Sequence, residues 1–268
     1  MGRPKIGAVS YLNTKPLVAG LEDAALDFDV IYDLPSRLAD RLSVGELDVA
    51  LIPVIEAVTN ADYTIVSDTC IACRGPVWSV KLMSRVDGGQ IQTLALDEGS
   101  RTSCVLAQIL LSRKFGVQPQ CSSLSIHDDW REVQTDAVLI IGDRAMKAHD
   151  PEFPFVWDLG EIWNQWTGKP FVFAVWAART ESDLDRFDHI LASSRDRGLR
   201  ELKTISLEQA SQYDLSDEEC LKYLRDNLHF NLGGDEKSGL ELFFQYAAEL
   251  RLIPQPFQLQ FHDCQTTG

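Results

Sequence analysis

The chain has 268 residues, of which 45% are hydrophobic, and it carries a formal net charge of −15 at neutral pH. This length allows one large domain or two of ordinary size, each with a buried core. The negative charge argues against nucleic acid or an anionic membrane surface as a partner, because both require a basic face. No stretch approaches the roughly 20 apolar residues of a membrane span, and the N-terminus lacks the pattern of a signal peptide, so we expect a cytoplasmic protein.

The opening segment predicts a buried strand that ends in a polar loop and a helix start. An apolar run from Lys5 gives way to polar residues, and Pro16 then suits the first turn of a helix over residues 14–21. Such a junction directs unpaired backbone N–H groups at one point, where a carboxylate or phosphate would bind. The alternative is that Ser10, Asn13 and Thr14 only cap the helix.

The next segments predict an α/β arrangement. Residues 27–34 and 48–54 read as strands, and residues 35–44 and 55–59 have helical spacing. Alternation of strands and helices is typical of a parallel sheet with right-handed crossovers, which binds ligands at the carboxyl ends of its strands. Two further strands are expected over residues 64–73 and 77–84.

A second unit follows a breaker at residues 87–89. We expect strands over 93–96, 120–125 and 137–141 and a helix over 100–115 that Ser100 caps, then a strand over 171–176 and helices over 181–197, 216–227 and 238–250. Gly198 should end the first of these last helices. The first unit needs the C-terminal helices for closure, so we predict an inserted second lobe. Lobe 1 would comprise 1–88 and 172–268 and lobe 2 residues 89–171, with hinges near 86–90 and 167–171.

Metal, redox and nucleotide chemistry have weak sequence support. The chain has six cysteines and five histidines, and only Cys70 and Cys73 form a C-x-x-C pair. A second pair at zinc spacing is missing, so we expect ordinary thiols in a reducing compartment. No P-loop, dinucleotide fingerprint or G-x-S-x-G elbow occurs. We therefore expect no metal site.

Several motifs in a fixed order carry a resemblance to a known family. They are VSYLNTKPL (9–17), GPVWSVKLMSR (75–85), LDEGSRTS (96–103), IGDRA (141–145), WTGKPFVFAVWAAR (166–179) and YLRDNLHFNLGGDEKSGLELFF (223–244). Together they resemble the chorismate dehydratases of the futalosine route to menaquinone. The resemblance implies a two-lobed α/β fold like that of type II periplasmic binding proteins, with chorismate held between the lobes. The reaction implied is loss of water, which gives 3-[(1-carboxyvinyl)oxy]benzoate without a cofactor.

The resemblance also implies the site residues. Asn13 is the candidate catalytic residue; because its amide lacks a usable basic pKa, it would orient groups, bind the departing hydroxyl or relay a proton with help from the substrate's carboxylate. The candidate substrate-binding residues are Ser10, Tyr11, Ser79, Ser100, Thr102, Ser103, Gly142 and Asp143. Structural alternatives remain, since Ser100 and Asp143 suit helix caps and Ser79 suits a local backbone partner. Lys15 or Arg101 would offset an anionic substrate's charge, although arginine is usually solvated.

Two other functions stay open. One is the sister enzyme of the same pathway, which forms a naphthoate, although its Pro-Cys-Asn-Asp opening is not matched here. The other is a cytoplasmic binding or sensing protein that holds an aromatic carboxylate without chemistry. The sequence gives no indication of the oligomeric state.

Overall fold

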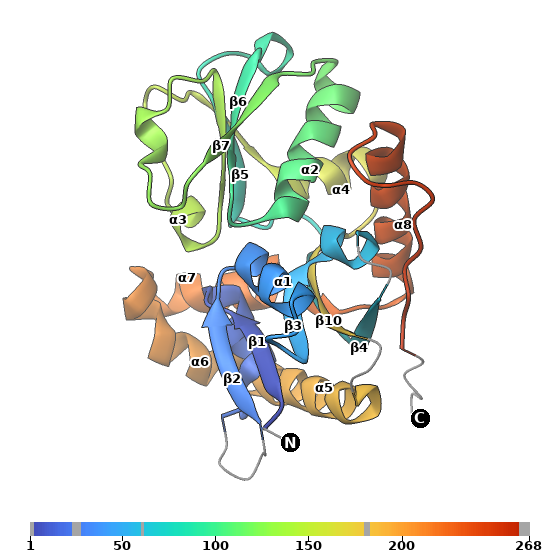
Figure 1. Cartoon of the computed structure of the whole chain (residues 1–268). Coiled ribbons are helices and arrows are strands. Elements are labelled where there is room, and N and C mark those ends of the chain that lie inside the picture. Colours follow the sequence, from blue (N-terminus) through green and yellow to red (C-terminus); the bar gives the residue numbers. More distant parts are fainter. Residues whose placement is uncertain (1–2, 23–27, 60–61, 180–182, 263–268) are drawn as a thin grey trace.

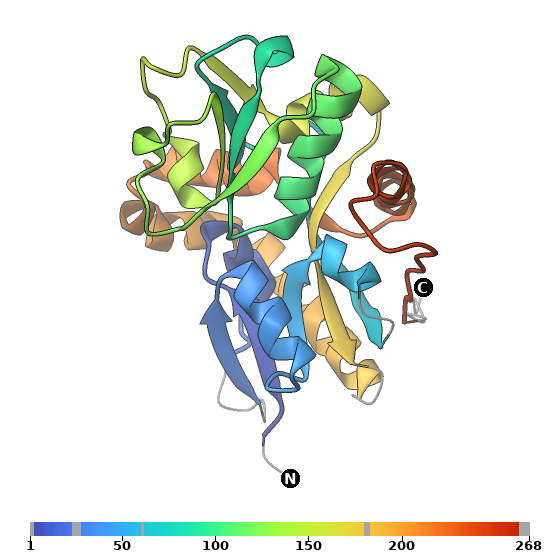
Figure 2. The same cartoon turned by 45° about the horizontal axis from the view of Figure 1, so that its top comes forward.

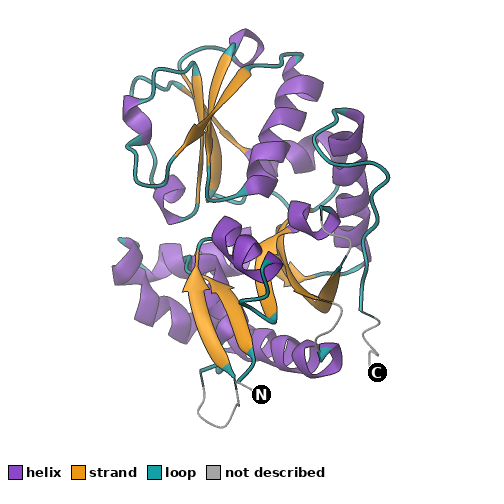
Figure 3. Ribbon diagram, in the orientation of Figure 1, coloured by secondary structure: helices purple, strands orange, loops and turns teal. Residues whose placement is uncertain are grey.

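The computed structural model describes residues 3–22, 28–59, 62–179 and 183–262, which form two lobes, each built on its own β-sheet (Figures 1 and 3). The strands of the first lobe are β1 (Lys5–Val9), β2 (Asp29–Asp33), β3 (Val49–Pro53), β4 (Tyr63–Cys73), β10 (Phe171–Arg179) and β11 (His229–Asn231). The strands of the second lobe are β5 (Val80–Ser84), β6 (Thr93–Asp97), β7 (Gln120–Leu124), β8 (Ala137–Ile141) and β9 (Phe155–Asp158). The architecture is the predicted two-lobed α/β fold.

The first sheet has the order β11-β4-β10-β3-β1-β2. Strands β1, β2 and β3 are parallel, and β10 runs antiparallel between β3 and β4. Every residue of β3 is buried, as expected for a strand that helices cover on both faces. Helix α1 (Pro35–Ser43) turns Leu38 and Leu42 into this core, and α5 (Leu184–Arg200) packs against β4.

The second sheet has the order β7-β6-β8-β5-β9. Strands β6, β7 and β8 are parallel, whereas β5 runs antiparallel to β8 and β9. Helix α2 (Arg101–Leu110) follows β6 and continues through a π-helical turn to Gly116, whose φ of 72° ends it. Short helix α3 (Asp143–Met146) follows β8, and α4 (Leu159–Thr167) follows β9.

The placement of β5 corrects the predicted lobe boundary at residue 88. Its strand was expected in the first lobe beside β4, but it pairs only with strands of the second sheet. The chain therefore passes between the sheets over residues 74–79, and it returns between α4 and β10 (Figure 2). An apolar strand fits either sheet equally well, so its partner depends on contacts distant in sequence.

Helix ends and short elements also differ from the prediction. Helix α8 (Gly234–Glu249) begins four residues earlier than expected, and α5 continues through Gly198, while residues 181 and 182 lie outside the described residues. Helix α7 (Asp217–Lys222) begins with a capping box at Ser216 and continues into a π-helical turn, Tyr223–Asn227, so that the two together cover the predicted helix. The sequence analysis missed β9, α4, β11 and α6 (Leu202–Gln209).

The return crossover is held by an aromatic cluster. Trp163 of α4 is fully buried and donates its indole N–H to the Pro170 carbonyl over 3.1 Å. Its ring meets Phe171 and Phe243 edge to face, at centroid distances of 5.3 and 6.3 Å. These contacts join α4, β10 and α8 into one unit beside the crossover.

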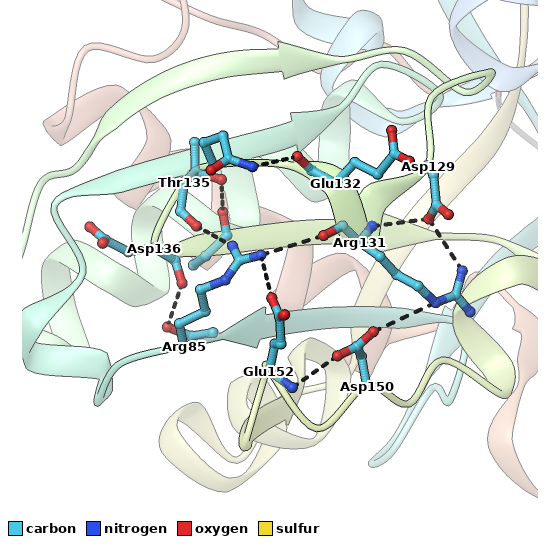
Figure 4. A network of polar contacts seen from close by, with 11 residues as sticks. Arg85, Asp129, Arg131, Glu132, Thr135, Asp136, Asp150 and Glu152 are labelled. Carbon is cyan, nitrogen blue, oxygen red and sulfur yellow. Dashed lines mark hydrogen bonds and ion pairs between the residues drawn. The ribbon is translucent and has the colours of Figure 1, made fainter.

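A polar network closes the far end of the second lobe (Figure 4). Arg85, just after β5, donates to the Thr135 carbonyl over 2.6 Å and lies 3.4 Å from Glu152. Arg131 forms ion pairs with Asp129 at 3.2 Å and with Asp150 at 3.8 Å. Because Arg131, Asp129 and Glu152 are exposed, the network orders loops more than it adds stability.

Both cysteines of the C-x-x-C pair lie in strand β4. Cys70 and Cys73 are buried free thiols, and burial raises the pKa of Cys73 to about 12. Their side chains start on opposite faces of β4, since they are three residues apart along a strand.

Within the described ranges, no helix has both the length and the apolarity needed to traverse a bilayer.

Candidate functional site

A pocket lies between the two lobes and, together with the open solvent at its mouth, comprises about 470 Å³ of empty space. First-lobe residues lining it include Val9, Tyr11, Asn13, Pro35, Pro53, Ile71, Phe173 and Ala174. Residues of the first crossover and the second lobe complete it: Val77, Ser79, Val80, Ser100, Ser103, Ile141 and Gly142. Val9, Pro53 and Ile141 end parallel strands of the two sheets. The pocket thus lies at the carboxyl edges of both sheets, where ligands of α/β proteins usually bind.

Most of the predicted site residues meet in this pocket. Those that line it are Tyr11, Asn13, Ser79, Ser100, Ser103 and Gly142. Three others do not line it. Ser10 is exposed beside a separate surface hollow, Thr102 is fully buried and accepts a hydrogen bond from the Ile55 N–H over 3.2 Å, and Asp143 accepts one from the Leu12 N–H over 3.2 Å. Thr102 and Asp143 therefore join the two lobes.

The opening segment differs from the predicted α-helix. After β1 the chain forms a 3-10 helix, Leu12–Val18, whose N-cap residue Tyr11 makes no capping hydrogen bond with its side chain. The capping alternative for Ser10, Asn13 and Thr14 is therefore wrong. The Leu12 N–H is satisfied instead by the carboxylate of Asp143 from the other lobe. This leaves Asn13 at the pocket, where the Thr14 hydroxyl donates to its amide oxygen over 3.3 Å.

Ser100 combines the two roles that its sequence position allowed. Its hydroxyl accepts from the Ser103 N–H over 3.4 Å and caps α2, and the two serine hydroxyl oxygens lie 3.0 Å apart. Both residues are buried and both line the pocket. The start of α2 thus presents two hydroxyl groups and the positive end of a helix dipole to the pocket, which suits an anionic group.

Tyr11 fits a slot made by two glycines of the second lobe. A Cβ on Gly142 would lie 2.9 Å from the Tyr11 ring, and one on Gly99 would lie 3.1 Å from its hydroxyl. Gly142 also has a φ of 72° and ψ of −158°, which side-chain-bearing residues rarely adopt. The Tyr11 hydroxyl is buried without a hydrogen-bond partner among the described residues. Such an unpaired buried group is a candidate ligand contact.

The charged residues lie around the pocket instead of in it. None of the described residues that line it carries a charge. Lys15 faces the separate hollow, and Arg101 pairs with Asp40 at 2.8 Å and Glu56 at 3.2 Å, so neither is the cation that the sequence analysis considered. Behind the Tyr11 slot, the fully buried Asp97 carboxylate accepts from the Gly99 and Ile141 N–H groups and pairs with Arg144.

The sequence analysis missed one residue beside the pocket. Tyr223, in the π-helical turn after α7, is fully buried and donates its hydroxyl to Ser79 Oγ over 2.9 Å. Burial raises its pKa strongly. Ser79 was expected within a strand over residues 77–84. It lies instead at the end of the crossover, one residue before β5 begins. The only sequence signal for Tyr223 was its place at the start of the last family motif.

Asp143 gives a pH-dependent prediction. Burial raises its pKa to about 6, against the opposing effects of the Leu12 N–H and Lys15. An unfolded aspartate has a pKa of about 3.9, so the native state binds the proton more tightly. The Asp143 contribution to the free energy of unfolding is therefore fully present below about pH 4. It is lost as the pH rises through about 6, and the loss is at most about 3 kcal/mol.

Asp143→Asn keeps an oxygen for the Leu12 N–H and removes this titration. We expect the free energy of unfolding of this variant, relative to that of the parent, to rise between about pH 4 and 7, as measured by urea unfolding. The same change at the exposed Asp128 is the control. A pH-independent difference between Asp143→Asn and the parent would contradict the assignment.

Comparisons with known proteins agree with this geometry. Residues 4–249 match the model of a family described as menaquinone biosynthesis. A chorismate dehydratase from Thermus thermophilus is 29% identical over 258 residues, covering 89% of this chain and 93% of that protein. A chorismate dehydratase from Campylobacter jejuni is 24% identical over 252 residues, covering 92% and 98%.

Solved structures show the same fold at low identity. Protein AF1704 from Archaeoglobus fulgidus has a TM-score of 0.75 at 13% identity, with 93% of this chain and 98% of that chain covered. The alkanesulfonate-binding protein SsuA from Xanthomonas axonopodis, bound to MOPS, has a TM-score of 0.67 at 14% identity, with 95% of each chain covered. The fold is thus that of periplasmic binding proteins. The family match spans both lobes and the pocket between them, and the chain belongs to the menaquinone biosynthesis family, as the likeness of its motifs to chorismate dehydratases indicated.

Proposed function

We propose that this chain is a cytoplasmic chorismate dehydratase of the futalosine route, which converts chorismate into 3-[(1-carboxyvinyl)oxy]benzoate. The observation that carries the proposal is that two motifs of the family, one with Tyr11 and Asn13 and the other with Ser79, converge on one pocket between the lobes. The family match and two relatives named chorismate dehydratase support the same activity.

The pocket suits a small ring with anionic substituents. Ile71, Phe173 and Val77 supply apolar walls for a ring. Ser100, Ser103 and the start of α2 would hold one carboxylate, without a cation from a side chain.

The reaction breaks one C–H and one C–O bond of the ring. The carbon that bears the ether loses a proton, its neighbour loses hydroxide, and the two leave as water while the ring becomes aromatic. Because aromatisation drives the step, a weak base suffices once the groups are oriented. Asn13 would orient the substrate and bind the departing hydroxyl, and the substrate's own side-chain carboxylate would take the proton.

The test is turnover of chorismate by the purified protein without added nucleotide or metal. We expect the absorbance of the diene to disappear and a product lighter by one water to accumulate, as followed by mass spectrometry. Unchanged chorismate from a folded protein would overturn the proposal. Equilibrium dialysis with chorismate would then detect the binding-protein alternative, and an assay for naphthoate formation the sister enzyme.

A further inference from the structure

Tyr223 connects two pocket residues that belong to different parts of the fold. Its hydroxyl donates to Ser79 Oγ over 2.9 Å, and the Asn13 side chain lies beside the same hydroxyl. Asn13 follows β1 of the first lobe, whereas Ser79 ends the crossover into the second. Tyr223 does not line the pocket itself, so any effect on a ligand must pass through these two residues.

The number of protons in this contact determines what each group can still do. The phenol has one proton, which goes to Ser79 Oγ, and its oxygen faces the Asn13 side chain. The Ser79 hydroxyl therefore keeps its own proton for an acceptor in the pocket. The Asn13 amide oxygen accepts from the Thr14 hydroxyl, which leaves the amide nitrogen to face Tyr223.

The backbone before Ser79 is held as firmly as its side chain. Trp78 has a φ of 66°, a conformation that a bulky residue adopts only when its surroundings impose it. Asp158 imposes it by accepting from the Val77 N–H over 3.0 Å and the Trp78 N–H over 2.6 Å. The Trp78 ring also meets the Tyr223 ring edge to face, with centroids 5.8 Å apart.

We propose that Tyr223 is a positioning residue for the dehydration, which fixes the Ser79 hydroxyl and the Asn13 amide relative to each other across the cleft. This inference rests on the proposed chorismate dehydratase activity. A purely structural tyrosine at this place would affect stability alone. A positioning residue affects turnover more than binding, because misdirected groups fail mainly in the transition state.

The test is Tyr223→Phe, which removes the hydroxyl and keeps the buried ring. We expect kcat for chorismate to fall about 10-fold to 100-fold with little change in KM. The matched control is Tyr246→Phe. Tyr246 packs against Trp166 in the aromatic cluster and should tolerate the loss of its hydroxyl. In a Ser79→Ala background, Tyr223→Phe should cost much less than in the parent, because the main group it positions is gone.

Asp158→Asn provides an independent variant. The asparagine retains an acceptor for the start of α4 but loses the acceptor of the Trp78 N–H, so kcat should also fall while the protein stays folded. Full kcat in folded Tyr223→Phe, or an equal loss in the parent and Ser79→Ala backgrounds, would overturn the proposal. If Tyr223→Phe does not fold, Asp158→Asn decides: reduced kcat supports positioning and full kcat refutes it. A parent without turnover would overturn the proposed function and, with it, this inference.

Discussion

Asn13→Ala is expected to lower the turnover of chorismate about 100-fold to 1,000-fold, the usual cost of losing one preorganised donor at a reacting group. Asn13 lines the pocket beside Tyr223, and its amide oxygen accepts from the Thr14 hydroxyl. Alanine removes the group that would meet the departing hydroxyl and leaves the backbone of the 3-10 helix unchanged. Steady-state kinetics should show the loss mainly in kcat.

The control is Asn231→Ala, which removes the same amide from an exposed position on the edge strand β11. This variant should keep the parent's activity. Retention of kcat within a few-fold by Asn13→Ala, with a normal melting temperature, would remove Asn13 from the centre of the mechanism. Product formed by the parent would still support the dehydratase.

Gly198→Ala is expected to cause the largest loss of stability. A Cβ at this position would lie 1.9 Å from the Pro16 carbonyl oxygen and 2.5 Å from its carbon. Both atoms belong to the backbone and cannot rotate away, so α5 must move off the 3-10 helix that carries Asn13. We expect a loss of about 3 kcal/mol, the upper part of the usual cost of overpacking, together with lower activity.

Urea unfolding of Gly198→Ala and of a matched helical glycine measures this effect. Gly234, the first residue of α8, has no atom within 4 Å of a built Cβ, so Gly234→Ala should be neutral or slightly stabilising. Equal midpoints for the two variants would show that α5 and the 3-10 helix separate without cost, against the close contact described here.

Gly198 also shows where helix prediction from sequence reaches its limit. A glycine after a helical pattern normally marks the helix end, yet here α5 continues because the missing side chain admits the backbone of another element. That requirement arises from a partner far away in the sequence. The same holds for β5, whose apolar pattern predicted a strand but not its sheet. Strongly periodic segments such as β3, β8 and α2 were predicted because their signals are local.

The site was predictable to the extent that local motifs deliver neighbouring residues to one place. The opening motif brought Tyr11 and Asn13 to the pocket, but it also suggested Ser10, which lies on the exposed side. At the start of α2, Ser103 lines the pocket and Thr102 is turned into the contact between the lobes. A motif identifies neighbours but not their directions. Tyr223 was missed because a buried aromatic residue in a helix usually belongs to the core.

The position of β10 in the first sheet determines the order in which the lobes can form on the ribosome. β10 lies between β4 and β3, so the first sheet stays in two pieces until residue 179 has been synthesised. All strands of the second sheet are present by residue 158. Since domains fold as units during synthesis, the lobe that begins later in the chain is complete earlier. Strands β1 to β4 of the first lobe are therefore synthesised early. Their sheet can close only when β10 has followed the strands of the second lobe out of the ribosome.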